Sequence, residues 1–159
     1  MSLSELQPAG DPVTRWVTFT LDHEKYCVDV MQAQEVLLMS EITPVPGAAP
    51  YVLGIINLRG NVVTVVDTRK RFLLAAKEPD DLTRIVIIEA KNSVLGMLVD
   101  SVADVVDLRR SDIESTPNVG NQASSQFIQG VASFQGELLI IIDLDKFMAQ
   151  EQQNDTFLF

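Results

Sequence analysis

Residues 51–72, YVLGIINLRGNVVTVVDTRKRF, contain two runs rich in β-branched residues on either side of a short Gly/Asn turn. The first run extends to Arg59, the turn falls at Gly60–Asn61, and the second run ends at Asp67. Such a pattern is typical of a β-hairpin. Asp67 is also a suitable N-cap for the basic residues that follow it. The stretch therefore predicts a hairpin followed by one helical turn.

The same plan occurs again in residues 127–148, FIQGVASFQGELLIIIDLDKFM, at a constant offset of 76 positions. A residue that recurs at an equivalent position is one that the fold itself needs, for a special backbone conformation or for a helix cap. Arg59 is different, because Gln135 stands at its equivalent position. Arg59 is therefore a candidate for recognition, with a solvated charge in the turn as the alternative interpretation. The recurring pairs are Tyr51/Phe127, Gly54/Gly130, Gly60/Gly136 and Asp67/Asp143.

The segments before the hairpins also repeat, with residues 83–90 matching 14–21 at an offset of 69. The chain is therefore a tandem duplication of residues 14–75 and 83–148, and the second copy carries seven additional residues before its hairpin. Many short strands with Gly/Pro turns favour a barrel or sandwich, and closure of a barrel removes exposed sheet edges. We expect a mainly β fold of two pseudo-symmetric, five-stranded barrels with short helices.

Local patterns complete the predicted elements of the first copy. Alternation over Trp16–Leu21 and Tyr26–Val30 indicates two strands. Apolar residues at three- and four-residue steps predict a short amphipathic helix over 31–38, with Glu35 facing outward. The proline-rich segment that follows fits a short edge strand at Ile42–Val45.

The ends of the chain differ from its body. Residues 1–13 are polar and hold Pro8, Gly10 and Pro12, so we expect a disordered lead. Residues 149–159 form a mostly polar tail that ends in Phe157–Phe159, for which the sequence offers no assignment. The chain shows no secretory signal and no apolar run near the roughly 18–20 residues needed to span a bilayer. A cytosolic protein is therefore expected.

Composition and charge exclude several classes of function. The chain has 159 residues, of which 47% are hydrophobic, which is enough for one packed domain. The formal net charge of −10 argues against nucleic acid as a partner. A single cysteine, Cys27, excludes an internal disulfide and a cysteine-based zinc cluster.

The sequence does not indicate catalysis. His23 lies in a polar turn, and Cys27 has apolar neighbours, which favours a packing role over a nucleophilic one. Asp100, Asp104 and Asp107 lack the ligand order and the glycine of an EF-hand, so a solvated acidic face is the better interpretation. No cofactor and no metal site are predicted.

Several motifs occur in the order Tyr26–Val30 with Gln34–Val36, Pro44–Pro46, Gly54–Gly60, Val65–Asp67, Gly96–Val102 and Thr116–Gly120. Together they resemble the CheW family of chemotaxis coupling proteins, and the resemblance covers about residues 14–148. It implies a fold of two SH3-like, five-stranded barrels, in agreement with the duplication. It also implies a non-catalytic adaptor that joins the cytoplasmic tips of chemoreceptors to the histidine kinase CheA.

The resemblance further implies two binding surfaces. The helical hairpin of a receptor tip would lie in an apolar groove between the barrels, which suits an amphipathic helix flanked by charges that set its register. The groove residues are Val30, Glu35, Val36, Asn57, Arg59, Val102 and Val105. Kinase contacts would lie at the barrel ends, around Ile42, Val45 and Val119. The protein would then be recruited to membrane-bound receptor arrays, in possible rings with CheA.

Two positions depart from the family pattern and leave alternatives open. Cys27 stands where glycine is common, although the second copy keeps Gly96 at the equivalent site. Leu38 stands where many members carry arginine, so the chain could serve a non-flagellar chemosensory pathway. A small-ligand module that uses the groove, with Arg59 at its mouth, is a further alternative. The least favoured is a hydrolase that uses His23 or Cys27.

Overall fold

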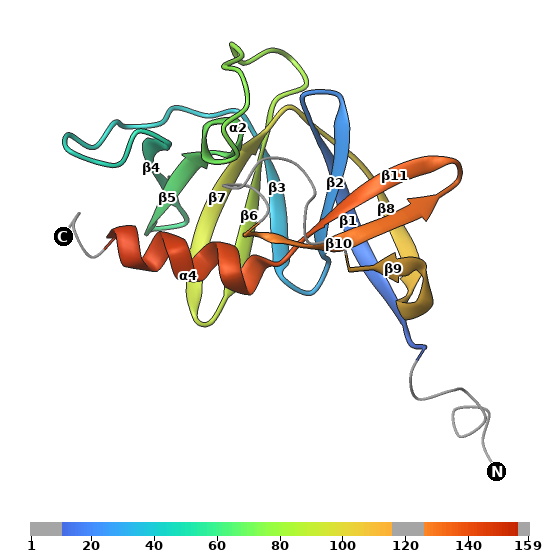
Figure 1. Cartoon of the computed structure of the whole chain (residues 1–159). Helices are drawn as coiled ribbons and strands as arrows, with labels where there is room; N and C mark the ends of the chain where they lie inside the picture. The colour runs from blue at the N-terminus through green and yellow to red at the C-terminus, as the bar shows by residue number, and fades with distance from the viewer. Residues whose placement is uncertain (1–10, 116–125, 156–159) are drawn as a thin grey trace.

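The structure is a computed structural model that describes residues 11–115 and 126–155, and within them the chain folds into two β-sheets (Figure 1). The first sheet has six strands, in the spatial order β8 (Ser101–Arg109), β1 (Val13–Leu21), β2 (Glu24–Asp29), β11 (Glu137–Ile142), β10 (Ile128–Phe134) and β9 (Ile113–Glu114). The second has five, in the order β3 (Ala33–Leu38), β6 (Arg84–Ala90), β7 (Ser93–Val99), β5 (Asn61–Asp67) and β4 (Val52–Leu58). The described helices are α2 (Thr68–Arg71), the 3-10 helix η1 (Arg110–Asp112) and α4 (Leu144–Asp155). The predicted mainly β fold is confirmed.

The two copies of the duplication exchange strands between the sheets. Strands β1 and β2 of the first copy join β8 to β11 of the second, whereas β3 to β5 of the first copy join β6 and β7 of the second. The copies meet in two parallel pairs, β2 with β11 and β5 with β7, and in two antiparallel pairs, β1 with β8 and β3 with β6. Neither copy therefore forms a sheet on its own, and each sheet depends on both.

The second sheet curls so that its two edge strands approach each other. Strands β3 and β4 lie at opposite ends of the strand order, yet Glu35 of β3 forms an ion pair with Arg59 of the β4–β5 turn. The chain after β3 then pairs with the outer edge of β4, where Thr43 and Ile55 exchange backbone hydrogen bonds of 2.9 and 2.8 Å. In the first sheet, β9 covers the outer edge of β10 in the same way.

Residues at equivalent positions confirm that the recurring glycines belong to the fold. A Cβ atom on Gly54 would lie 2.1 Å from the Thr43 carbonyl oxygen, and one on Gly130 would lie 2.4 Å from the Glu114 oxygen. Each glycine thus admits the close backbone approach that protects an outer strand. The capping role of the aspartates is also confirmed, since Asp67 and Asp143 accept hydrogen bonds from the backbone N–H of Lys70 and Lys146, respectively.

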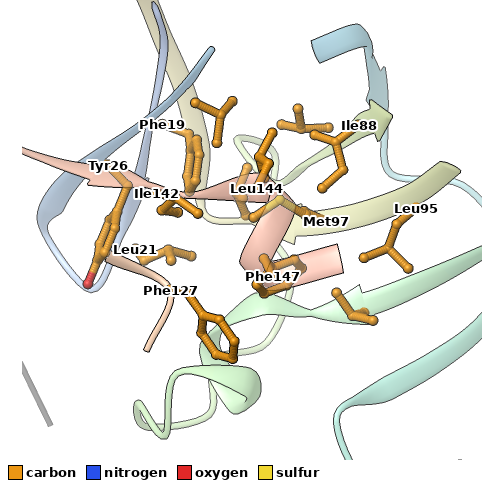
Figure 2. Close-up of a cluster of buried hydrophobic side chains, with 14 of the residues drawn as sticks. Phe19, Leu21, Tyr26, Ile88, Leu95, Met97, Phe127, Ile142, Leu144 and Phe147 are labelled. Atoms are coloured by element: carbon orange, nitrogen blue, oxygen red, sulfur yellow. The ribbon is translucent and has the colours of Figure 1, made fainter. Parts of the chain in front are cut away.

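The largest core cluster lies between the two sheets, and both sheets and α4 contribute to it (Figure 2). It is rich in aromatic rings, and the Phe127 and Phe147 rings meet edge to face at 5.3 Å between centroids. Two smaller clusters lie inside the sheets: Trp16, Cys27, Val106, Leu108, Ala132, Leu139 and Ile141 in the first, and Ile56, Val63, Val65, Ile85 and Ile87 in the second.

The predicted helix over 31–38 is wrong, because residues Ala33–Leu38 form β3, which pairs with β6. The pairing register shifts between Ala33 and Glu35. A bulge of this kind displaces the two-residue alternation by one position, which produces the three- and four-residue spacing that resembled a helix. The prediction of a strand at Ile42–Val45 is also wrong, since this segment forms only an isolated β-bridge at Thr43.

Three boundaries also differ from the sequence prediction. The hairpin turn lies at Arg59–Gly60, one residue earlier than expected, because both residues have positive φ angles of 52° and 88°. Strand β1 begins at Val13, and the Ser111 backbone N–H donates to the Asp11 carboxylate, so the expected lead is part of the structure from residue 11. Helix α4 extends to Asp155, where a tail was expected from residue 149.

Candidate functional site

The predicted groove residues lie mainly on β3 and β8, which are edge strands of different sheets and equivalent in the duplication. Val36 and Val105 occupy equivalent positions on them, and these side chains are 43% and 54% exposed. Val30 and Val102 are partly buried and pack against the core cluster between the sheets. The structure thus places one exposed valine on each edge strand and two partly buried valines beside the inter-sheet core.

Glu35 and Arg59 form a bidentate ion pair, which sequence reasoning did not predict. Arg59 Nη1 and Nη2 donate to Glu35 Oε1 and Oε2 at 2.6 and 2.5 Å. The hydrogen bonds from Arg59 hold the pKa of Glu35 below its ordinary value. The Arg59 side chain is 71% exposed and that of Glu35 is 24% exposed. Two parallel N–H···O bonds fix the guanidinium plane, so the pair forms a defined charge pattern at the surface.

The backbone of the turn does not account for Arg59. Gln135, at the equivalent position, has a φ angle of 50° against 52° for Arg59, so either residue adopts this conformation. Asn57 has a local role instead, because its Oδ1 accepts the Gly60 backbone N–H at 2.8 Å. Its side chain stabilises the turn that positions Arg59, and it remains exposed.

The proposed kinase-contact residues are described only in part. Ile42 is partly buried against the inner cluster of the second sheet and lines an open cavity of about 500 Å³ together with Met39, Leu53 and Leu98. Val45 is partly buried in the segment between β3 and β4. Val119 lies outside the described residues.

Cys27 has a packing role, as the sequence predicted. Its side chain is fully buried in the inner cluster of the first sheet, and this burial raises the pKa of the thiol to about 12. A Cβ atom on the equivalent Gly96 would lie 3.0 Å from Ile85 Cγ2, so the second sheet has little room for a side chain there. Among residues 11–115 and 126–155, no group of three or more His, Cys, Asp or Glu side chains could hold a metal ion.

The fold and these surfaces define a class of protein. Apolar side chains exposed on an edge strand of each sheet, together with an ion pair of fixed geometry between β3 and the β4–β5 turn, are features of a surface that docks other proteins. Within the part of the chain that the structure describes, no helix is both long and apolar enough to cross a membrane.

Comparison with known proteins identifies the family. The sequence model of the family described as the CheW-like domain matches residues 15–152 of the chain. The chain is 34% identical to the chemotaxis protein CheW of Bacillus subtilis, over 89% of this chain and 91% of that protein, and 33% identical to the CheW of Rhizobium meliloti, over 86% and 88%. It superposes on the scaffolding protein TtCheW from Thermoanaerobacter tengcongensis with a TM-score of 0.77 and 32% identity, over 82% of this chain and 89% of that one.

The chain therefore belongs to the CheW-like family. Its role is that of a non-catalytic scaffold in chemotaxis signalling, as it is for this family of adaptors. The resemblance noted in the sequence is confirmed over nearly its full extent.

Proposed function

We propose that the chain couples the cytoplasmic tips of chemoreceptors to a CheA-type histidine kinase, with the receptor docked across β3 and β8. The observation that carries this proposal is the bidentate pair that Arg59 forms with Glu35, the residue that precedes the exposed Val36 on β3. The protein would reach receptor arrays at the membrane through this contact. The kinase would bind elsewhere, at the segment that follows β3.

The chemistry of this surface suits a helical hairpin. Val36 and Val105 offer apolar area on two separate edges, and an amphipathic helix buries its apolar face against such side chains. The Glu35–Arg59 pair provides a donor group and an acceptor group at fixed positions, which set the register of a polar flank on the partner. The valines would supply affinity and the charge pair would supply specificity.

The same ion pair argues against the alternative of a small-ligand module with Arg59 at the mouth of the groove. That alternative needs Arg59 to bind a carboxylate or a similar group at the mouth of the groove. Two of the Arg59 nitrogens already donate to Glu35, so a ligand anion would have to compete with an intramolecular carboxylate.

A charge exchange separates recognition by Arg59 from its structural role. The double variant Glu35→Arg/Arg59→Glu keeps an ion pair in the same place but reverses the charges that face a partner. We expect both Arg59→Asp and the double variant to lose co-sedimentation with receptor-containing membranes, while circular dichroism shows an intact fold. Gln135→Asp is the matched control, since it changes the equivalent turn of the first sheet and should bind like wild type.

The opposite results would count against the proposed receptor surface. If Val36→Asp and Arg59→Asp both bind receptor membranes normally, the surface across β3 and β8 is wrong. If the double variant binds normally while Arg59→Asp does not, the pair maintains local structure and does not recognise the receptor.

The proposed kinase surface needs its own measurement. Ile42 and Val45 belong to the segment that pairs with β4 through Thr43, so their positions depend on that bridge. Val45→Asp should reduce binding to purified CheA while receptor binding persists. Equal loss of both interactions would instead indicate that the two surfaces are not separate.

The pathway that the protein serves remains a separate proposal. Leu38 is 70% exposed at the end of β3, beside the proposed receptor surface. An apolar residue here favours an apolar partner position on the receptor, and the non-flagellar alternative needs such a change in the choice of receptor. Leu38→Arg should therefore shift preference among receptors in a co-sedimentation panel, and an unchanged panel would remove this argument.

A further inference from the structure

The strand connections of the described residues pass from one sheet to the other at two equivalent places. The first connection, from β2 to β3, contains Met31, and the second, from β7 to β8, consists of Asp100. The offset of 69 aligns Met31 with Asp100, so the two crossings are versions of the same element. Any difference between them is not demanded by the repeated fold.

At the second crossing, a nearly buried guanidinium gathers three other segments of the chain. Arg69 is 8% exposed, and its Nε and Nη2 donate to the two carboxylate oxygens of Asp100 at 2.8 and 2.7 Å. Its Nη1 donates to the Ala75 carbonyl oxygen at 2.7 Å, and the Asp22 carboxylate lies 3.6 Å from Nη2. We refer to Arg69, Asp100 and Asp22 as the clasp.

The members of the clasp come from both sheets. Arg69 lies on α2, directly after β5 of the second sheet, and Asp22 lies in the β1–β2 turn of the first. The Asp22 backbone N–H also donates to Asp100 Oδ2 at 2.9 Å. Burial alone raises the pKa of Asp100, but the hydrogen bonds from Arg69 and Asp22 outweigh it and hold that pKa below its ordinary value. Asp100 is therefore charged whenever the protein is near neutral pH.

The first crossing has no comparable cluster among the residues aligned with the clasp. Asp145, Met31 and Lys91 stand at the positions equivalent to Arg69, Asp100 and Asp22. Met31 is 86% exposed, and the contact made by Asp145 is an exposed hydrogen bond of 3.1 Å from the Gln32 side chain. The crossing thus forms without an ion pair, so the clasp does something other than permit the fold.

We propose that Arg69 is a positioning residue: the clasp sets the angle between the two sheets and with it the relative placement of β3 and β8. The core between the sheets is apolar, and apolar contact stabilises without imposing a direction. A bidentate arginine–carboxylate pair does impose one, because its planar fork accepts a narrow range of geometries. The consequence for receptor docking rests on the function proposed above, whereas the consequence for the angle does not.

The angle is tested by electron–electron spin distance measurements in a Cys27→Ala background. Val62 on β5 and Leu138 on β11 are equivalent in the duplication, lie on different sheets and are 67% and 53% exposed, so both accept a spin-labelled cysteine. We expect a narrow distance distribution with the clasp intact, and a broader or shifted one in Arg69→Gln and Asp100→Asn. Arg69→Lys keeps the charge but loses the planar guanidinium fork, so its distance distribution should lie between that of the intact clasp and that of Arg69→Gln.

The matched control is Arg15→Gln, which removes an Arg–Asp pair of 3.2 Å that joins β1 and β8 within one sheet. It should leave the distribution unchanged. Asp22→Asn guards against loss of folding, because Asp22 is half exposed and the change removes only the carboxylate charge that faces Arg69, while the Asp22 backbone N–H still donates to Asp100. If Asp22→Asn and Asp100→Asn are folded by circular dichroism and keep the wild-type distribution, the proposal is overturned.

Receptor co-sedimentation, measured on the unlabelled variants, tests the link to docking. We expect Asp100→Asn to weaken binding to receptor-containing membranes by about fivefold or more, the lower range of coupling between distant sites. Altered distances with unchanged binding would show that the clasp does not set the docking geometry. If the wild-type chain itself does not bind, the proposed function fails, while the distance measurements still decide on the clasp.

Discussion

Replacing Gly54 by alanine tests how the outer edge of β4 is protected. The new Cβ atom would lie 2.1 Å from the Thr43 carbonyl oxygen, so the segment after β3 has to move away from β4. That movement breaks the two backbone hydrogen bonds between Thr43 and Ile55. Each such bond contributes about 0.5–1.5 kcal/mol, so the bridge accounts for about 1–3 kcal/mol of the free energy of unfolding.

The positive φ angle of Gly54, 150°, adds a backbone penalty that has to be separated from the steric one. Gly47→Ala supplies the first comparison, because Gly47 has a φ of 80° and nothing within 4 Å of the new Cβ. Gly130→Ala supplies the second comparison, which tests the steric effect at the equivalent position, because its new Cβ atom would lie 2.4 Å from the Glu114 backbone oxygen. We expect Gly54→Ala to be the most destabilising of the three.

The measurement is urea and thermal unfolding followed by circular dichroism. A loss of about 1–3 kcal/mol beyond the Gly47→Ala value corresponds to a Tm about 2–12 °C lower for a chain of this size. Because Thr43 lies between Ile42 and Val45 of the proposed kinase surface, the proposed binding to CheA should weaken as well. If Gly54→Ala is no more destabilising than Gly47→Ala, the close approach does not hold this edge, and the explanation of the recurring glycine is wrong.

Two further predictions concern the core. Phe147→Ala should lower the free energy of unfolding by about 3–5 kcal/mol, because this fully buried ring of α4 packs on Phe127. Lys146→Ala, at an exposed position of the same helix, should change it little. Both values are measured by urea unfolding, and equal effects would mean that α4 is not part of the core. With its pKa raised to about 12, the Cys27 thiol should not react with a thiol reagent at pH 8 until the chain is unfolded in urea, and rapid reaction of the native protein would contradict its burial.

The sequence by itself determined the features that depend on neighbours along the chain. The duplication, the hairpin after Tyr51, the capping by Asp67 and the need for glycine at residue 54 were all predicted from local pattern and recurrence, and the structure confirms them. The CheW-like family was predicted as well, from motifs whose residues stand at fixed spacings. These features require no knowledge of which strands pair.

The tertiary structure alone decided how the two copies combine. The bulge after Ala33 made strand β3 look helical in sequence, and only its pairing with β6 resolves the ambiguity. The repeat aligned equivalent residues but contained no information on pairing, so the exchange of strands between the sheets was not predicted. Register and pairing depend on contacts between segments far apart in the chain, which local periodicity does not record.

The candidate site shows the same division. Recurrence identified Arg59 as a residue that the fold does not demand, but not its partner Glu35, which lies 24 residues away in sequence. The clasp was missed for the same reason, since Asp22 and Asp100 are 78 residues apart and meet only where the chain crosses between the sheets. An ion pair forms where folding places two charges within reach: the curl of the second sheet brings Glu35 to Arg59, and the second crossing brings Asp100 to Arg69.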